Sequence, residues 1–385
     1  MPEFVELCIE RPVGSKGNKD VINLLNEAFS KLKYKMLELP LKCTKWMHGE
    51  SFIRQNGNQI SIFPCPFSIE LKGNYPVRYV SLLSELKNIS DYNGILIFKD
   101  ELTKASLMPK NFPFYFPDED KQVYDLIESI DPKGIIAISG QDPVSGLNPF
   151  PIFEDANFEI PSAYAAALSN ITENSEIYVE INSKRRGEKS IQPVYKKDGS
   201  STDIILIAAH VDSKYSTGGA VDNASGLFVL CEIAELLSSN KYNHTIEIVP
   251  FNGEDSPEVP GQLAYLEYLK QNNLNIKAVI NIDGVGHIGS EEVFSFYNFE
   301  ENAKAKIISG TGISEGDQWY SGDHAMFAFQ EIPCIAVTAS TMFPFLMKSI
   351  IHTKNDKPEL VDVKLLKALN RTIIKIIEIL DAKLF

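Results

Sequence analysis

The sequence predicts an α/β protein in which a three-layer α/β/α sheet, mostly parallel, is interrupted by an inserted, mostly β domain. From about residue 192 to the end, strand-like and helix-like segments alternate, which indicates a largely parallel sheet with helices on both faces. From about residue 43 to 186, prolines are frequent and short β-like runs replace long helices. We therefore expect a discontinuous domain, residues 1–43 and 190–385, and an inserted domain, residues 44–189.

The composition fits a globular protein of about two domains. Of the 385 residues, 44% are hydrophobic and 23% are charged, which is enough apolar material for a sizeable core. The net charge of −14 argues against nucleic acid or an anionic membrane as the main partner, because both are bound through basic surfaces. No run approaches the ~18 apolar residues of a membrane span.

The cysteines indicate a reducing compartment. There are five of them, an odd number without a Cys-x-x-Cys pair, so neither a disulfide framework nor a thiolate zinc site is expected. The first residues also lack the basic and apolar regions of a signal peptide. We therefore expect a cytoplasmic protein, although a secreted chain whose signal peptide has been removed would give the same pattern.

The elements expected in the first domain follow from apolar periodicity. Residues 20–32 carry a helical stripe, and residues 34–41 form a short strand that needs a sheet to join. In the second half, a continuous apolar run predicts a strand at 204–209, and the alternation of strands and helices predicts further strands at 245–251, 278–282, 293–297 and 334–338. Apolar residues at helical spacing predict helices at about 226–237, 262–271, 323–329 and 363–380.

The inserted domain contains strand-like runs but no candidate catalytic or metal-binding residues in its sequence. The candidate strands are 52–53, 59–63, 94–98, 134–138 and 176–181. No titratable cluster with metal-ligand spacing occurs among them. A structural role, or one in controlling access of a substrate, is therefore expected for this domain.

Histidines and acids follow the predicted strands of the second half. His210 and Asp212 come after the first of them and Asp222 precedes its helix; the others are Glu254, Asp255, Asp283 and His352. Taken singly, Asp222-Asn223 could be a helix N-cap and Glu254-Asp255 a solvated loop. Taken together, they follow strands whose carboxyl ends meet at one edge of a parallel sheet, where several acids repel one another unless a cation compensates.

Two histidines and three carboxylates match the needs of a pair of zinc-like ions. One carboxylate would bridge the ions, and one further acid would remain free to act as a base. Asp212 stands two residues from His210, close enough to accept the other ring N–H of that histidine.

The chain resembles the co-catalytic di-zinc aminopeptidases, the clan MH zinc exopeptidases that also include glutamate carboxypeptidases and glutaminyl cyclases. The resemblance covers roughly residues 10–42 and 190–385. It is carried by the order and spacing of six segments: His210-Val211-Asp212, Gly219 to Gly226, Phe251 to Asp255, Asn281 to Gly286, Ser321 to Phe327 with Ile332-Pro333, and Ile351-His352-Thr353 with Asp356. In the insert, Gly134 to Ile138 and Ile160 to Tyr164 resemble a protease-associated domain.

The resemblance implies two Zn²⁺ per chain, for which Co²⁺ or Mn²⁺ could substitute. Asp222 would bridge the ions, with His210 and Asp283 completing one metal site and Asp255 and His352 the other. Glu254 would be the general base, and Asp212 would hold the ligating tautomer of His210. The chain departs from the family at position 255, where many relatives have glutamate, so the geometry or affinity of that metal site is open to change.

These residues imply a zinc-dependent metallo-aminopeptidase that hydrolyses N-terminal residues from peptides with a free N-terminus. Two alternatives remain. A one-zinc glutaminyl cyclase shares the fold, and so would a non-catalytic scaffold, although a scaffold is expected to lose ligands that this chain retains.

His324 is expected to be structural, because the site is complete without it. Trp319-Tyr320 could line a side-chain pocket or pack in the core.

Overall fold

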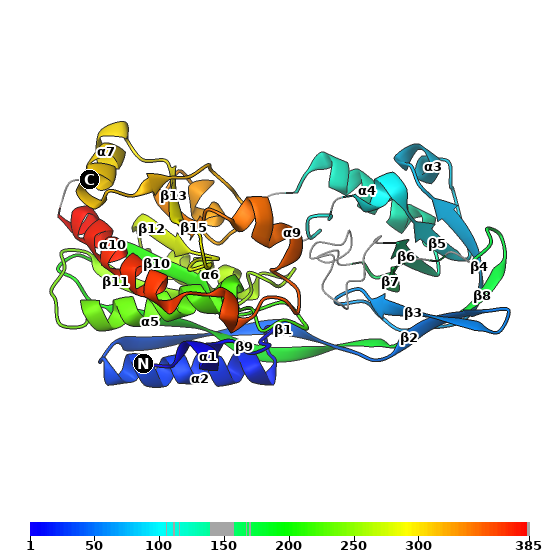
Figure 1. The fold of residues 1–385 in the computed structure, drawn as a ribbon, viewed down its shortest axis with the longest axis horizontal. Helices are drawn as coiled ribbons and strands as arrows, with labels where there is room; N and C mark the ends of the chain where they lie inside the picture. Colours follow the sequence, from blue (N-terminus) through cyan, green and yellow to red (C-terminus); the bar gives the residue numbers. More distant parts are fainter. Residues whose placement is uncertain are drawn as a thin grey trace. The chain divides into compact units, whose positions relative to one another are not determined.

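The computed structural model describes residues 1–104, 106–110, 112–114, 116–138, 158–166, 168 and 171–382. The chain divides into two compact units (Figure 1). The first comprises Met1–Cys43, Lys189–Met347 and Lys354–Phe385, and the second comprises Thr44–Glu188 and Lys348–Thr353. The sequence predicts residues 348–353 in the discontinuous domain, whereas they group with the second unit.

The first unit is built on an eight-stranded sheet of order β1-β9-β11-β10-β12-β15-β13-β14. Strand β10 pairs in parallel with β11 and β12, and β12 pairs in parallel with β15. Antiparallel pairs join β9 to β11 and β13 to β15. The strands are β1 Lys35–His48, β9 Ser183–Lys197, β10 Ile204–His210, β11 Thr245–Phe251, β12 Ile276–Ile282, β13 Glu292–Tyr297, β14 Ser314–Glu315 and β15 Cys334–Ala339.

The helices of the first unit cover both faces of this sheet. On one face, Tyr195 of β9, which lies opposite Ile248, stacks on Phe29 of α2 with ring centroids 3.8 Å apart. On the other face, the neighbouring Glu247 accepts a hydrogen bond from Tyr265 of α6. The main helices are α2 Lys16–Lys31, α5 Ser225–Leu237, α6 Pro260–Gln271, α7 Glu301–Thr311 and α10 Val363–Asp381, with short α1 Phe4–Leu7 and α8 Ala325–Ala328. The predicted three-layer fold class is confirmed.

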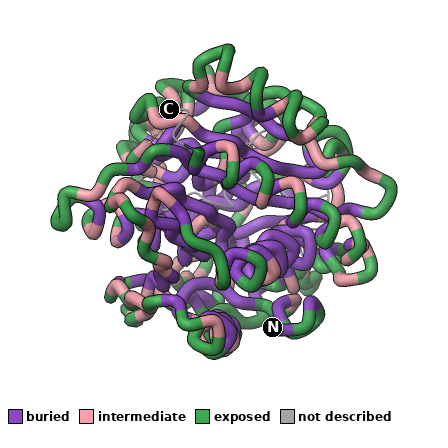
Figure 2. The backbone as a smooth tube through the Cα atoms, turned by 90° about the vertical axis from the view of Figure 1, so that its left-hand side faces the viewer, coloured by how far each residue is buried: buried purple, intermediate pink, exposed green. Residues whose placement is uncertain are grey.

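Several elements of the first unit differ from the sequence prediction, which contained none of α1, β9 and β14. Strand β1 continues to His48, well past the predicted end at Leu41. Helix α7 was not predicted, and its only buried residue is Ile307, so no apolar stripe marks it in the sequence. By contrast, every residue of β10 and β11 is buried, which is why their mainly apolar sequences located these central strands. Figure 2 shows buried backbone in the interior and exposed backbone mostly at the periphery of the view.

The second unit contains a closed barrel of order β2-β3-β7-β6-β5-β4-β8. Its strands are β2 Ser51–Gln55, β3 Asn58–Pro64, β4 Leu71–Val80, β5 Ile95–Phe98, β6 Gly134–Ile138, β7 Ser162–Ala165 and β8 Glu176–Ile181. This agrees with an inserted, mostly β domain. The likeness to a protease-associated domain stays a prediction.

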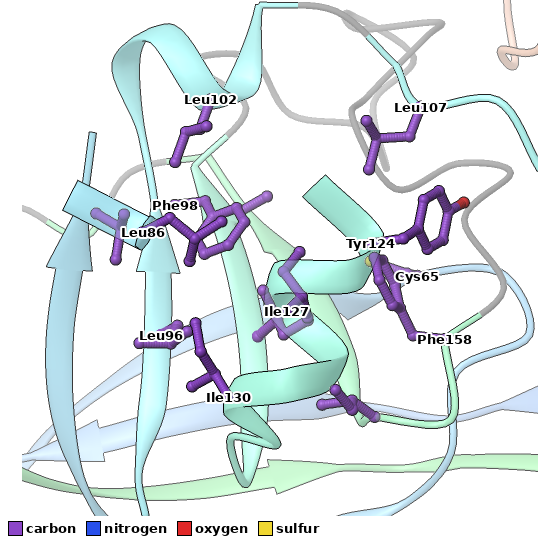
Figure 3. Close-up of a cluster of buried hydrophobic side chains, with 14 of the residues drawn as sticks. Cys65, Leu86, Leu96, Phe98, Leu102, Leu107, Tyr124, Ile127, Ile130 and Phe158 are labelled. Atoms are coloured by element: carbon purple, nitrogen blue, oxygen red, sulfur yellow. The ribbon is translucent and has the colours of Figure 1, made fainter. Parts of the chain in front are cut away.

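Two apolar layers hold the second unit together. Each layer is a cluster of buried side chains, and alternate residues of β5 and β6 face different clusters. Ile97 and Ile136 belong to the first cluster, and Leu96 and Phe98 belong to the second. The second cluster is completed by α3 Leu83–Lys87 and α4 Asp118–Ile130, which pack Leu86, Tyr124, Ile127 and Ile130 against the barrel strands (Figure 3). The sequence did not predict these helices. They explain why β5 and β6 are apolar throughout, since both of their faces are covered.

None of the helices in the described part of the chain combines the length and the hydropathy that a membrane span requires.

Candidate active site

Three neighbouring strands of the first unit place their carboxyl ends side by side. His210 is the last residue of β10, which lies between β11 and β12. It is in register with Phe251, the last residue of β11, so Glu254 and Asp255 follow on one side. Asp283 directly follows β12 on the other side. Because all three strands are parallel, the acids surround the imidazole of the central strand.

The distances from the His210 ring define the site. Its Nε2 lies 2.8 Å from Asp222 Oδ1, 3.6 Å from Asp283 Oδ1 and 3.8 Å from Glu254 Oε2. One ligand atom each from His210, Asp222 and Asp283 lie within 4.8 Å of one another, and the same holds for His210, Glu254 and Asp255. An imidazole nitrogen with two buried carboxylates is a donor set that suits Zn²⁺. The residues present therefore fit a divalent metal ion.

Asp222 is held by its backbone. The carboxylate of Asp356 accepts hydrogen bonds from the backbone N–H groups of Val221 and Asp222, at 2.7 and 3.0 Å. The side-chain oxygen of the next residue, Asn223, accepts from the Gly226 N–H in the first turn of helix α5 at 3.0 Å. The N-cap residue of α5 is Ala224, so neither Asp222 nor Asn223 holds that position. The Asp222 side chain faces His210 instead.

Arg11 ties the segments around His210 and Asp222 together. This fully buried guanidinium donates to the carbonyl oxygens of Val211, Gly218 and Gly219. Its backbone N–H donates to the hydroxyl of Ser213. The loop between the two site residues is therefore anchored at both ends by one side chain. Arg11 belonged to the family-like start of the sequence, but its role was not predicted.

Asp212 contacts different groups from those expected. His210 Nδ1 lies 3.1 Å from the backbone oxygen of Asp212 and 3.8 Å from its carboxylate. The carboxylate accepts from three successive backbone N–H groups, those of Gly253, Glu254 and Asp255, at 2.9 to 3.1 Å. The main chain of Asp212 thus orients the imidazole, while its side chain fixes the loop that carries Glu254 and Asp255.

Asp323 and Gln262 lie beside the same loop. Gln262 Nε2 donates to Asp323 Oδ1 at 2.7 Å, and Gln262 Oε1 lies 3.1 Å from the place that a Cβ on Gly253 would occupy. The other oxygen of Asp323 is buried and has no hydrogen-bond partner among the described residues. Asp323 stands in one of the family-like segments, so that segment could have pointed to it. Nothing in the sequence around Gln262 marked that residue.

Burial and neighbouring charges both change the pKa of the Glu254 carboxyl group. Burial raises the pKa of its carboxyl group well above the ordinary value; His210 counteracts this shift, and Asp255, Asp283 and Asp323 add to it. Its side chain is nevertheless 19% exposed, more than those of His210 and Asp283. A carboxyl group with a raised pKa and access to water suits proton transfer near neutral pH.

His324 is enclosed and engaged at both ring nitrogens. Its Nε2 lies 2.8 Å from the backbone oxygen of Trp319, and its Nδ1 lies 3.4 Å from the Asn281 side-chain amide. Burial lowers the pKa of His324 to about 4, so the ring is neutral. These contacts are those of a packing residue, the role expected for it. Trp319 is itself largely buried, and Tyr320 is exposed.

His352 lies on Lys348–Thr353, the segment that groups with the second unit. Its backbone has a φ of 59°, in the left-handed region. Its role as a metal ligand stays a prediction.

Comparisons with known proteins agree with this fold. Residues 193–377 match the model of Peptidase family M28. Aminopeptidase YwaD of Bacillus subtilis is 34% identical over 135 residues, which are 32% of this chain and 30% of that protein. A probable zinc metalloprotease of Pyrenophora tritici-repentis is 34% identical over 95 residues, 23% of this chain and 22% of the relative. These alignments thus span less than a third of each relative.

Solved structures share the fold over nearly the whole chain. A zinc aminopeptidase from Bacillus subtilis, BSAP, superposes with a TM-score of 0.75 at 17% identity, covering 97% of this chain and 93% of that one. A peptidase M28 precursor from Shewanella amazonensis gives a TM-score of 0.71 at 16% identity, covering 99% and 92%. The predicted resemblance thus agrees with these comparisons: residues 193–377, just under half of the chain, match peptidase family M28, and the solved structures share the fold of nearly the whole chain.

Proposed function

We propose that this protein is a zinc-dependent aminopeptidase that removes N-terminal residues from peptides. The observation that carries the proposal is the group of His210, Asp222 and Asp283, whose ligand atoms lie within 4.8 Å of one another beside Glu254. The relatives support it, since one is named an aminopeptidase, one a probable zinc metalloprotease, and one solved structure is a zinc aminopeptidase.

Two zinc ions are proposed for the site. His210, Asp222 and Asp283 would hold the first, and Asp222 would bridge to a second ion held by Asp255 and His352. Bound zinc supplies a water of lowered pKa and stabilises negative charge that develops on the substrate carbonyl oxygen. The convergence of buried acids on one imidazole supports this, because such acids repel one another without a cation.

Glu254 is proposed as the general base. Among the described contacts, the Glu254 side chain forms no hydrogen bond that would fix it in a structural role. Its Oε2 lies 3.8 Å from His210 Nε2. Its carboxylate would take a proton from the attacking water and pass it to the amine that leaves when the peptide bond breaks. The raised pKa of its carboxyl group fits a residue that must hold that proton between the two steps.

Asp212 is proposed to position this base. Its carboxylate accepts the N–H groups of the two residues that carry the base and one ligand, Glu254 and Asp255, as well as that of Gly253. A loop fixed by three hydrogen bonds to a charged acceptor presents its side chains in one arrangement.

The excess of acids in the site would also bind the free α-ammonium group of a substrate, which favours cleavage at the N-terminus.

The test is a metal analysis combined with a substrate panel. Purified protein should contain two zinc ions per chain and should hydrolyse aminoacyl anilides and peptides with a free N-terminus. N-acetylated versions of the same peptides should not be cleaved. One tightly bound zinc without anilide hydrolysis, together with cyclisation of N-terminal glutamine, would instead identify a glutaminyl cyclase. Protein that binds no zinc would refute the proposal.

A further inference from the structure

Lys214 lies among the acids of the candidate site, and the proposed mechanism gives it no role. It follows Ser213 in the loop that leaves β10. Its Nζ lies 3.8 Å from Oδ1 of Asp255. Only 11% of the Lys214 side chain and 2% of the Asp255 side chain are exposed. The site therefore holds a positive charge beside one of its acids, in a place that water screens weakly.

The backbone around Lys214 is fixed by the fold. Arg11 donates to the Val211 carbonyl oxygen at 2.8 Å and to the Gly218 carbonyl oxygen at 2.6 Å, one on each side of Lys214. The Arg11 backbone N–H also donates to Ser213 Oγ at 3.0 Å. Asp255 is fixed as well, by its N–H bond to Asp212. The contact between Lys214 and Asp255 thus joins two anchored segments.

The two sides of the site differ in the charges that an incoming cation meets. On one side, the ion pairs of the His210 ring are all with acids, namely Asp212, Asp222, Glu254 and Asp283. The ligand to compare with Asp255 is Asp283, which forms no ion pair with a lysine or arginine in the described part of the chain. On the other side, the Asp255 carboxylate already faces the ammonium group of Lys214.

We propose that Lys214 competes with a divalent cation for Asp255 and so makes the metal site containing Asp255 the weaker of the two. The inference rests on the proposed function, in which these residues bind two zinc ions. An ion entering beside Asp255 must displace the ammonium group from the carboxylate and then bear its repulsion. An ion bound by His210 and Asp283 meets neither cost at these two ligands. Lys214 thereby sets the free zinc concentration at which the second ion is taken up.

The experiment measures zinc binding directly, without reference to activity. Metal-free wild-type protein, Lys214→Met and Lys214→Arg are titrated with Zn²⁺ against a chromophoric chelator, which gives two successive dissociation constants. Lys214→Met removes the charge and keeps the length of the side chain, whereas Lys214→Arg keeps the charge. Lys16→Met removes a charge from a side chain that is 89% exposed, and it controls for net charge.

We expect Lys214→Met to tighten the weaker zinc site at least tenfold and to change the tighter site less than threefold. Lys214→Arg and Lys16→Met should keep both wild-type constants within threefold. The proposal is overturned if Lys214→Met leaves both constants unchanged or tightens only the stronger site. Wild-type protein that binds no zinc would overturn the proposed function itself, whereas two sites of equal affinity would overturn this inference alone. If Lys214→Met does not fold, Lys214→Gln replaces it in the same titration.

Discussion

The two units of the molecule differ in what they bury. Among the described residues, the second unit buries its polar groups as hydroxyls, those of Ser51, Ser68, Ser162, Ser183 and Thr353. The first unit buries many ionisable side chains, among them Arg11, His210, Asp212, Asp222, Asp255, Asp283, Asp323 and Asp356. Buried charges cost free energy unless they are paired, hydrogen-bonded or bound to metal. The stability of the first unit should therefore depend on metal and pH, and that of the second on apolar packing.

This difference indicates which residues of each unit can take part in catalysis or metal binding. In the second unit, the side chains of β5 and β6 alternate between two apolar clusters, so both faces of these strands serve packing. In the first unit, the central strands are also buried over most of their length, but the residues at or just beyond their ends are a histidine and acids. The free energy gained by burying these strands supports a cluster that is unfavourable by itself. Substitutions in the two units should separate these contributions.

The largest effect is expected for Asp222→Ala. This substitution removes the proposed bridging ligand from a group whose other members lie within 4.8 Å, so bound zinc should be lost and activity should fall to background. Elemental analysis of the purified variant, together with anilide hydrolysis, checks this. Asp91→Ala, the same change at an exposed acid of the second unit, should keep both ions and full activity. Retention of two zinc ions by Asp222→Ala would refute the bridging role.

The next effect is expected for Glu254→Gln. Glutamine keeps the size of the side chain but cannot accept the proton of the attacking water, so kcat should fall by ~10²–10⁴-fold. Zinc content should stay at the wild-type value, because Glu254 is not proposed as a ligand. Steady-state kinetics and elemental analysis on the same preparation give both numbers. A variant with near-normal kcat would exclude Glu254 as the base.

The sequence predicted the centre of the first unit better than its margins. Strand β11 was predicted with the observed ends, Thr245 and Phe251, because a strand buried on both faces is mainly apolar, here with Glu247 as the buried exception. The convergence of His210, Asp283 and Glu254 also followed, since parallel strands end at one edge of a sheet. Helix α4 was missed, although Tyr124, Ile127 and Ile130 have helical spacing, because the prolines around it favoured a β interpretation.

The supporting contacts could not be predicted, because they depend on atoms that sequence spacing does not place. Asp212 stands two positions after His210, and this spacing allows a ring-to-carboxylate bond. The backbone oxygen of Asp212 takes that position instead, and the carboxylate turns to the loop after β11. Lys214 and Gln262 reach the site through side chains that leave from other loops and helices. Such contacts arise from packing, for which the sequence offers no periodic signal.

A smaller effect, confined to the second unit, is expected for Ile136→Ala. Ile136 is fully buried inside the barrel cluster, so its truncation should lower the free energy of unfolding of that unit by about 2–5 kcal/mol. Hydrogen exchange of the barrel amides measures this, and zinc affinity should not change. Ile207→Ala, the same truncation in β10 of the first unit, should weaken zinc binding, because that strand carries His210. Equal effects of both variants on zinc binding would contradict the division of roles between the units.

The smallest effect is expected for Glu292→Gln, which tests a half-buried acid of the first unit outside the proposed metal ligands. Burial raises the pKa of Glu292 to about 7, while its Oε1 accepts the Gly286 N–H. A folded-state pKa above the unfolded value means that wild-type stability declines as pH rises from about 4.5 to about 7. Glutamine keeps the accepting oxygen and cannot ionise, so the variant should gain about 1–2 kcal/mol over wild type between pH 5 and pH 7.5 in urea unfolding. Glu291→Gln, at the exposed neighbour, should show no such gain, and a pH-independent difference for Glu292→Gln would mean that burial of this acid carries no cost.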